Sequence, residues 1–195
     1  GETSGNKDLF DYVILSNIYQ TQKWFYSLFE PGFEFTLDIM IRVNSAILNG
    51  IEYRLKTVFD HSVRTKILKG SLKKQPLNLI NDNRVEREIE YNLLKEKIES
   101  ILTEIHYNSN ISLPDIAQFY SDFLKLCPFD MGNGRTLRIL VNYLFFKADF
   151  PFIYFEESDK DIYQEAMNCS INGSHEKLIE YFLYRIEKSF AILEI

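Results

Sequence analysis

The segment from Arg135 to Ala148 constrains the fold more than any other part of the sequence, because a helix over these residues would be apolar on nearly every side. Leu, Ile, Val, Tyr and Phe fill most of its positions. A helix of this kind is stable in water only where other elements cover most of its surface. It is shorter than the roughly 20 apolar residues that a bilayer-spanning helix requires. We therefore predict that it lies at the centre of a helical bundle.

Other stretches have the apolar spacing of helices that pack around such a centre, and Gly and Pro fall singly between them. The best-defined start is Ser112-Leu113-Pro114-Asp115, which has an N-cap, a Pro in the first turn and an acid that completes a capping box. Ser158 and Ser174 are the expected N-caps of the last two helices. The sequence thus predicts an all-α fold. The expected helices cover approximately residues 8–29, 36–48, 51–58, 82–105, 112–126, 135–148, 158–168 and 174–192.

Length and composition indicate one cytoplasmic domain over residues 1–195, of which residues 1–6 are interpreted as a cloning remnant. The net charge of −6 gives no basic surface for nucleic acid. The sequence has no apolar run long enough for a membrane span, and its start lacks the features of a signal peptide. Cys127 and Cys169 are too few for a disulfide framework, so a reducing compartment is expected. We therefore expect neither nucleic acid nor a membrane as a partner.

The helical period is lost between residues 59 and 76, where Lys, Arg, Ser and Gly accumulate. This composition is typical of exposed connections. We predict an exposed loop or a short hairpin there.

The loop over residues 127–138 has the composition of an anion site. Gly132 and Gly134 permit positive φ and close backbone approach, and Asn133 tolerates the left-handed region, so successive N–H groups can form a nest. A helix N-terminus follows, and Arg135 and Arg138 share a face of its first turn. These cations oppose the helix dipole unless they hold an anion. The alternative is a tight interhelix turn with solvated arginines.

This loop resembles the signature of the Fic family (filamentation induced by cAMP), His-Pro-Phe-x-Asp/Glu-Gly-Asn-Gly-Arg-x-x-Arg. Upstream, the run from His61 to Gly70 is similar to the β-hairpin flap of that family. The resemblance implies a Fic-type helical bundle with a short β-hairpin flap. The signature positions that match are Pro128, Phe129, Gly132, Asn133, Gly134, Arg135 and Arg138.

The resemblance also implies an activity, which in the family is AMPylation: the transfer of AMP from ATP to a hydroxyl side chain of a target protein. By this likeness the backbone of Gly132 to Arg135 and the Asn133 side chain would cradle the phosphates, and Arg135 with Arg138 would hold the terminal ones. The flap would align the target chain by adding it as a strand. The flap residues implied are Arg64, Thr65, Lys69 and Gly70.

Two departures from the signature predict an impaired enzyme. Cys127 stands where the family has the general-base His, and Met131 stands where it has the acid that binds Mg²⁺. Loss of a general base typically costs about 10² to 10⁴ in rate, and a thioether does not suit a hard cation. Asp130 is a weak substitute for the metal ligand, because a one-residue shift in a tight turn re-aims its side chain. We expect ATP as the nucleotide and little role for Mg²⁺.

Three interpretations of the function remain open. The first is a degenerate Fic adenylyltransferase that still binds nucleotide. In the second, Cys127, activated beside Arg135, transfers AMP or another phosphate-containing group; the competing view is that Cys127 only fills the space of the histidine. The third is a protein-interaction module without enzymatic activity. The family's inhibitory helix, with Ser/Thr-x-x-x-Glu, has its nearest counterpart in Ser189 to Glu194, where the spacing is one residue too long.

Overall fold

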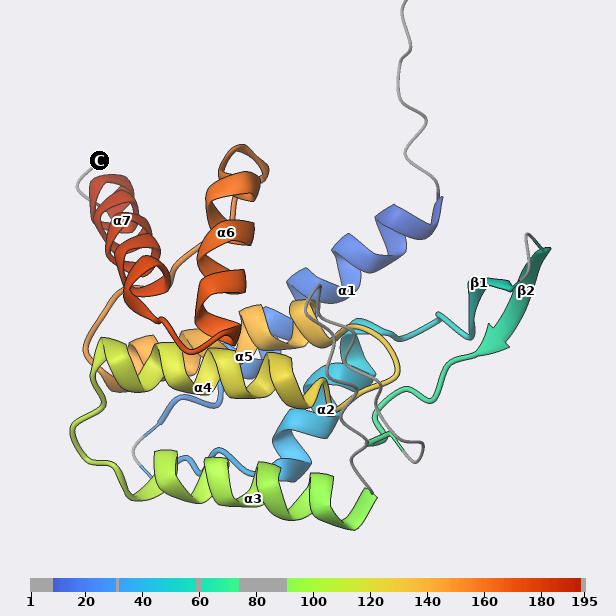
Figure 1. Cartoon of the computed structure of the whole chain (residues 1–195), viewed down its shortest axis with the longest axis horizontal. Helices are drawn as coiled ribbons and strands as arrows, with labels where there is room; N and C mark the ends of the chain where they lie inside the picture. Colours follow the sequence, from blue (N-terminus) through green and yellow to red (C-terminus); the bar gives the residue numbers. More distant parts are fainter. Residues whose placement is uncertain (1–8, 31, 59–60, 74–90, 194–195) are drawn as a thin grey trace, which may run out of the picture.

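The computed structural model describes residues 9–30, 32–58, 61–73 and 91–193. These residues form helices α1 to α7, one 3-10 turn and one antiparallel hairpin (Figure 1). The elements are α1 (Leu9–Tyr26), α2 (Leu37–Ile47), β1 (Tyr53–Val58), β2 (His61–Lys66), α3 (Tyr91–Tyr107), α4 (Leu113–Leu126), α5 (Asn133–Lys147), η1 (Glu157–Asp159), α6 (Lys160–Ile171) and α7 (Glu176–Leu193).

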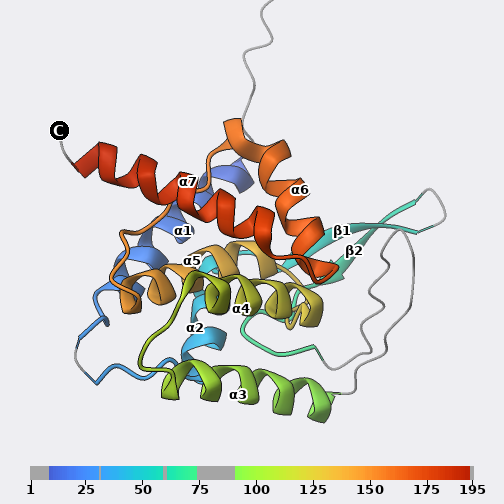
Figure 2. The ribbon, with the colours of Figure 1, turned by 60° about the vertical axis from the view of Figure 1, so that its left-hand side comes forward.

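Helix α5 lies at the centre of the bundle, as its apolar surface predicts. It contacts α1, α2 and α4, while α4 in turn contacts α3, α6 and α7. Figures 1 and 2 show α3 on one side of the α4–α5 pair and α6 with α7 on the other. Leu137, Leu140, Val141 and Phe145 of α5 are fully buried. Burial contributes about 1.5–3 kcal/mol per such side chain, so this helix is an important source of stability.

An aromatic cluster joins α1 to the far end of α5. The Phe29 ring meets the rings of Phe25 and Tyr143 edge to face, with centroids 4.9 and 5.1 Å away. Such pairs contribute about 0.5–1.5 kcal/mol beyond the area they bury. The cluster fixes α1 against the centre of the bundle at the end remote from the 127–138 loop.

The hairpin shows that the helix predicted over residues 51–58 is wrong, and it shows where the predicted hairpin lies. Residues 51–58 were expected as a short helix, but Tyr53–Val58 form β1, which pairs with β2 from Tyr53 opposite Lys66 to Val58 opposite His61. Ile51, Leu55 and Val58 have the spacing of a helical face, while Ile51, Tyr53 and Leu55 also alternate as in a strand, and such short runs are ambiguous until a partner strand is present. The hairpin therefore begins six residues before the predicted start at 59, and it projects from the bundle (Figure 1).

The other helices agree with the predicted ones except at their ends. The capping box at Ser112 is present, with Asp115 accepting the Ser112 N–H at 2.8 Å. Ser158 is not an N-cap, because a 3-10 turn intervenes and α6 begins at Lys160. The Ser174 hydroxyl donates to the Glu176 carboxylate, and α7 begins at Glu176. Residues 82–90 of the helix predicted over 82–105 lie outside the described residues.

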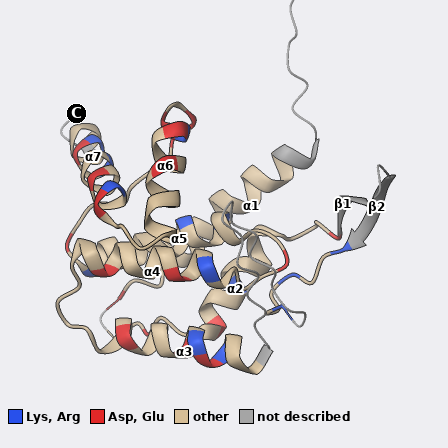
Figure 3. Cartoon of the chain, viewed as in Figure 1, with Lys and Arg blue, Asp and Glu red and all other residues tan. Residues whose placement is uncertain are grey.

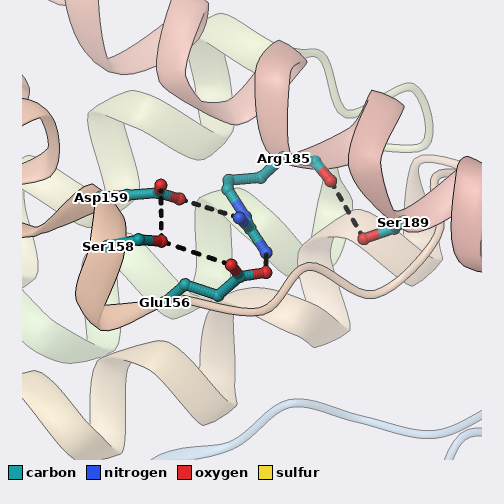
Figure 4. A network of polar contacts seen from close by, with 5 residues as sticks. All are labelled: Glu156, Ser158, Asp159, Arg185 and Ser189. Atoms are coloured by element: carbon teal, nitrogen blue, oxygen red, sulfur yellow. Dashed lines mark hydrogen bonds and ion pairs between the residues drawn. The ribbon is translucent and has the colours of Figure 1, made fainter.

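A buried ion pair connects α7 to the segment that leads into α6. The Arg185 side chain is 1% exposed and donates to Asp159 at 2.8 Å and to Glu156 at 2.6 Å (Figure 4). Ser158 donates to both carboxylates, so the acidic pair is itself held in place. Ser189, a residue of the possible inhibitory motif, donates to the Arg185 carbonyl at 3.0 Å; Glu194 lies outside the described residues.

Acidic and basic residues are interspersed along α3 and α7 (Figure 3). None of the helices in the described ranges is long and apolar enough to span a membrane.

Candidate functional site

In the 127–138 loop, residues 127–132 connect α4 to α5 and residues 133–138 form the start of α5. The connection has a left-handed residue at each end. Cys127 has φ 44° and Gly132 has φ 82°. The Cys127 N–H closes α4 by donating to the Phe123 carbonyl at 2.8 Å. A left-handed conformation at a residue with a Cβ costs about 1–2 kcal/mol, so contacts around the loop must hold Cys127 there. Gly134, for which the sequence allowed a positive φ, instead lies in the first turn of α5, as does Asn133.

The Asn133 side chain closes the loop on itself. Its Oδ1 accepts the Phe129 N–H at 2.9 Å, and its Nδ2 donates to the Phe129 carbonyl at 2.7 Å. Phe129 is fully buried, so the bonds fix both the shape of the loop and its seat on the core. The amide thus acts on the loop backbone in this structure. Its contact with phosphates stays a prediction.

Residues that follow the hairpin anchor the first half of the loop. Leu72 forms an antiparallel bridge with Phe129, and the Lys73 N–H donates to the Pro128 carbonyl at 2.8 Å. The second half is anchored by α2, because Asn44 donates to the Met131 carbonyl at 2.9 Å. The loop is therefore anchored on both sides, and these anchors limit the conformations that a ligand would have to order.

Arg138 is a half-buried cation without a counter-ion among the described residues. Its guanidinium lies 5.8 Å from the centre of the Phe155 ring, and it forms no hydrogen bond or ion pair with any described residue. Burial raises the pKa of the nearby Tyr120 and Tyr181 hydroxyls, so both stay neutral and leave the charge uncompensated. An anion at this position would be attracted in a medium of lower dielectric than water.

Two further cations lie close to the same loop. Arg135 is half-buried in the first turn of α5, where the unpaired N–H groups of the helix also point. The Lys73 ammonium donates to the Cys127 thiol, with Nζ 3.6 Å from Sγ. Gly134 leaves space beside Arg138, whose Nη1 lies 4.0 Å from where a Cβ would stand. The loop thus combines positive side chains, a helix N-terminus and little steric obstruction.

Met131, which the resemblance places at the metal position of the Fic signature, does not fit Mg²⁺. The Met131 side chain packs against the hydrophobic core, and its carbonyl is already bonded to Asn44. A thioether is a soft ligand, and Mg²⁺ requires oxygen. In the described part of the chain no three His, Cys, Asp or Glu side chains form a metal cluster. Asp130 is half-buried beside Met131 and has a contact of its own.

The predicted flap residues are divided between β2 and the turn that follows it. Arg64 is opposite Leu55 in the hairpin register, and Thr65 is opposite Arg54. Lys69 is exposed, and Gly70 has φ 61° where the chain returns to the bundle. The hairpin and the loop therefore belong to one region of the molecule, although the sequence separates them by about 60 residues.

Sequence reasoning missed two residues of this site, Asn44 and Lys73. Asn44 lies among Met40, Val43 and Ile47 on the apolar face of α2, and a single amide on such a face is the signal that could have revealed it. Lys73 belongs to the basic stretch after the hairpin, and its place beside Cys127 had no signal in the sequence.

Comparison with known proteins places the fold. No protein-family model and no curated protein sequence matches the chain. Among solved structures, a Fic domain containing signaling protein from Bacteroides thetaiotaomicron superimposes with a TM-score of 0.75 at 18% identity, covering 98% of this chain and 74% of that one. Fic-1 from C. elegans matches with a TM-score of 0.74 at 14% identity over 100% of this chain and 55% of that one.

A third match carries a nucleotide analogue. BepC, a VirB-translocated effector protein from Bartonella tribocorum, was solved with bound AMPPNP and matches with a TM-score of 0.58 at 14% identity, over 95% of this chain and 90% of that one. The chain thus spans about half the length of the Fic-1 structure and most of BepC. All three contain the same arrangement of helices. The chain has the Fic-domain fold.

Proposed function

We propose that the chain binds ATP at the 127–138 loop through its phosphates. The observation that carries this proposal is the half-buried Arg138 guanidinium, which has no counter-ion among the described residues. A buried cation is costly unless it is paired. A phosphate beside the N-terminus of α5 would provide that partner and accept hydrogen bonds from the helix N–H groups.

The nucleotide is the phosphate ligand best supported by the comparisons. BepC has the same fold and was solved with bound AMPPNP, an analogue of ATP. In this chain the corresponding binding groups would be the backbone from Gly132 to Arg135 and the guanidinium groups of Arg135 and Arg138. The Asn133 side chain would act by shaping the loop.

AMP transfer to a protein hydroxyl would be weak in this chain. In that reaction the hydroxyl oxygen forms a bond to the α-phosphorus while pyrophosphate leaves, and a base takes the hydroxyl proton. No imidazole is present at position 127, and Met131 offers no oxygen to a metal that would share the charge of the phosphates. Removal of a general base costs about 10² to 10⁴ in rate. Binding without efficient transfer is therefore our first proposal.

The contact between Lys73 and Cys127 favours a second candidate, in which the thiol replaces the histidine. The ammonium would stabilise a thiolate, and the thiolate would take the hydroxyl proton of the target. The product would be AMP, or another phosphate-containing group, linked to the target hydroxyl. Labelled ATP distinguishes the candidates, since only the second leaves label on protein that Cys127→Ala removes.

Calorimetric titration with ATP tests the binding proposal. Arg138→Ala should weaken ATP by about tenfold or more, as expected for a charge-assisted hydrogen bond of ~1.5–3 kcal/mol, and should weaken AMP less. Arg42→Ala is the matched control, because Arg42 also lies over an aromatic ring, 4.8 Å from the centre of Trp24, outside the site. Equal affinity in wild type and Arg138→Ala would refute the assignment. No heat at millimolar ATP would favour an interaction module that uses the hairpin.

A further inference from the structure

A single buried amide connects the hairpin to the loop. Asn44 is 0% exposed on the face of α2 that points into the core, between Val43 and Ile47, which are equally buried. A buried amide without partners costs about 1–3 kcal/mol. A polar residue at such a position therefore indicates specific contacts.

Each end of the Asn44 amide holds a different part of the site. Its Nδ2 donates to the Met131 carbonyl at 2.9 Å and to the Thr136 hydroxyl at 3.1 Å, on either side of the start of α5. Its Oδ1 accepts the Gly70 N–H at 3.1 Å, at the base of the hairpin. Segments that lie 26, 87 and 92 residues away in the chain thus meet at one side chain.

Two glycines allow this close approach. A Cβ at Gly70 would stand 2.7 Å from the Ser45 Cβ, and one at Gly132 would stand 3.2 Å from Ile47 Cδ1 and 3.3 Å from Asn44 Nδ2. Both residues also have positive φ, 61° and 82°. The base of the hairpin and the loop therefore both pack closely against the last turns of α2.

We propose that Asn44 is a positioning residue that keeps the hairpin in register with the phosphate loop, so that ATP bound at the loop also orders the hairpin base. The proposal rests on the proposed binding of ATP. A ligand that restricts the Met131 to Thr136 backbone also restricts the amide bonded to it, and the same amide is the acceptor for Gly70. Ordering at one site then lowers the cost of ordering at the other.

The loop has a second anchor, which makes the role of Asn44 separable from folding. The bridge between Leu72 and Phe129 and the bond from Lys73 N–H to the Pro128 carbonyl involve only backbone atoms. They would hold the first half of the loop when Asn44 is replaced. Loss of Asn44 should therefore uncouple the hairpin base while ATP still binds.

Hydrogen exchange of backbone amides, measured by NMR on the whole chain with and without ATP, tests the proposal. In wild type, saturating ATP should slow exchange of the Gly70 amide by about fivefold or more, the factor that corresponds to one hydrogen bond of ordinary net strength. In Asn44→Ala this slowing should disappear, even at an ATP concentration that calorimetry shows to saturate the variant.

Asn142→Ala is the matched control for general destabilisation. Asn142 is also buried and forms three hydrogen bonds, to the Tyr26 hydroxyl and to the carbonyl and N–H of Ile153, away from the loop. It should lower thermal stability to a similar degree yet keep the effect of ATP on Gly70. If Asn44→Ala does not fold, Asn44→Asp keeps an acceptor for Gly70 and removes the donor to Met131, and it should also lose the effect.

The outcomes separate the inference from the function on which it rests. If ATP binds to wild type and Gly70 exchange is unchanged, the role of Asn44 is wrong and nucleotide binding stands. Loss of the ATP effect in Asn142→Ala to the same extent would also overturn it, because any weakened bundle would then behave alike. If calorimetry detects no ATP binding to wild type, the proposed function itself fails.

Discussion

Lys73 donates a hydrogen bond to Cys127, with the ammonium nitrogen 3.6 Å from the thiol sulfur. The two residues are 54 positions apart, and the contact forms because the chain after the hairpin returns to bridge the loop at Phe129. A cation therefore lies against the side chain that the resemblance to the Fic signature places at the position of the histidine. This contact affects how readily the Cys127 thiol reacts.

Lys73→Met should slow the alkylation of Cys127 by iodoacetamide by about tenfold at neutral pH, as a loss of ~1.4 kcal/mol of stabilisation would. The ammonium stabilises the negative charge that the sulfur carries as it reacts, and Met keeps the length of the side chain without the charge. Peptide mass spectrometry measures the rate at Cys127 and, as an internal reference, at Cys169.

Lys69→Met is the control for this measurement, because Lys69 is exposed in the same segment and has no contact with Cys127. Equal slowing in both variants would mean that net charge, rather than the Lys73 contact, sets the rate.

Cys127→His together with Met131→Asp should restore AMP transfer from ATP, measured as labelled AMP incorporated into protein. The left-handed conformation at position 127 suits His, which is enriched among non-glycine residues there. The single variants should remain inactive, because base and metal act in one transition state. Asp at 131 also exchanges a core-packing side chain for a carboxylate, so some loss of stability is expected.

A double variant that is folded and binds ATP yet transfers no AMP would contradict this prediction. It would show that the pocket or the hairpin has changed beyond the two signature positions.

The affinity for ATP should depend little on Mg²⁺ in wild type. Met131 packs against the core, and its carbonyl is bonded to Asn44, so this position offers no oxygen ligand. Calorimetry with Mg²⁺ and with EDTA should give dissociation constants for ATP that differ by less than about threefold. A tenfold difference would correspond to ~1.4 kcal/mol of binding free energy. A large gain with Mg²⁺ that Asp130→Ala abolishes would assign the metal to Asp130.

Arg185→Ala should lower the free energy of unfolding by about 3–5 kcal/mol, because it leaves Asp159 buried without its partner. Arg185→Met with Asp159→Leu should recover much of this loss, since well-packed apolar residues often replace a buried pair at little cost. Urea denaturation of the wild type and the variants measures both effects. A loss below ~1 kcal/mol in Arg185→Ala would mean that the network is not a stability determinant.

The same network predicts that the stability of the protein decreases at acidic pH. The hydrogen bond and charge of Arg185 hold the pKa of Glu156 below its usual value. A carboxyl whose pKa is depressed by folding contributes stability above its unfolded pKa, and this contribution is lost as the pH falls through the folded pKa. Wild-type melting temperature should therefore fall from about pH 5 downward, and it should fall less steeply in Glu156→Gln.

The predicted helices agree best with the structure where residues close in the sequence decide the conformation. The capping box at Ser112 and the apolar run of α5 depend on neighbours within a few residues, so their position could be predicted from the pattern. Residues 51–58 were predicted as a helix because the spacing of apolar residues in so short a run fits a helical face as well as a strand. Their strand pairing with His61 to Lys66 decides the conformation.

The sequence determined the fold class of this protein and the composition of its candidate site. These are the central apolar helix, the Gly-Asn-Gly loop with its arginines, and Cys127 and Met131 at the positions where the resemblance to the Fic signature expects His and an acid. Tertiary structure decided which groups act on that loop. Asn44, Lys73 and Phe155 reach it from α2, from the segment after the hairpin and from the approach to α6. Such contacts between distant segments depend on how helices pack, and a local pattern in the chain does not encode which side chains the packing brings together.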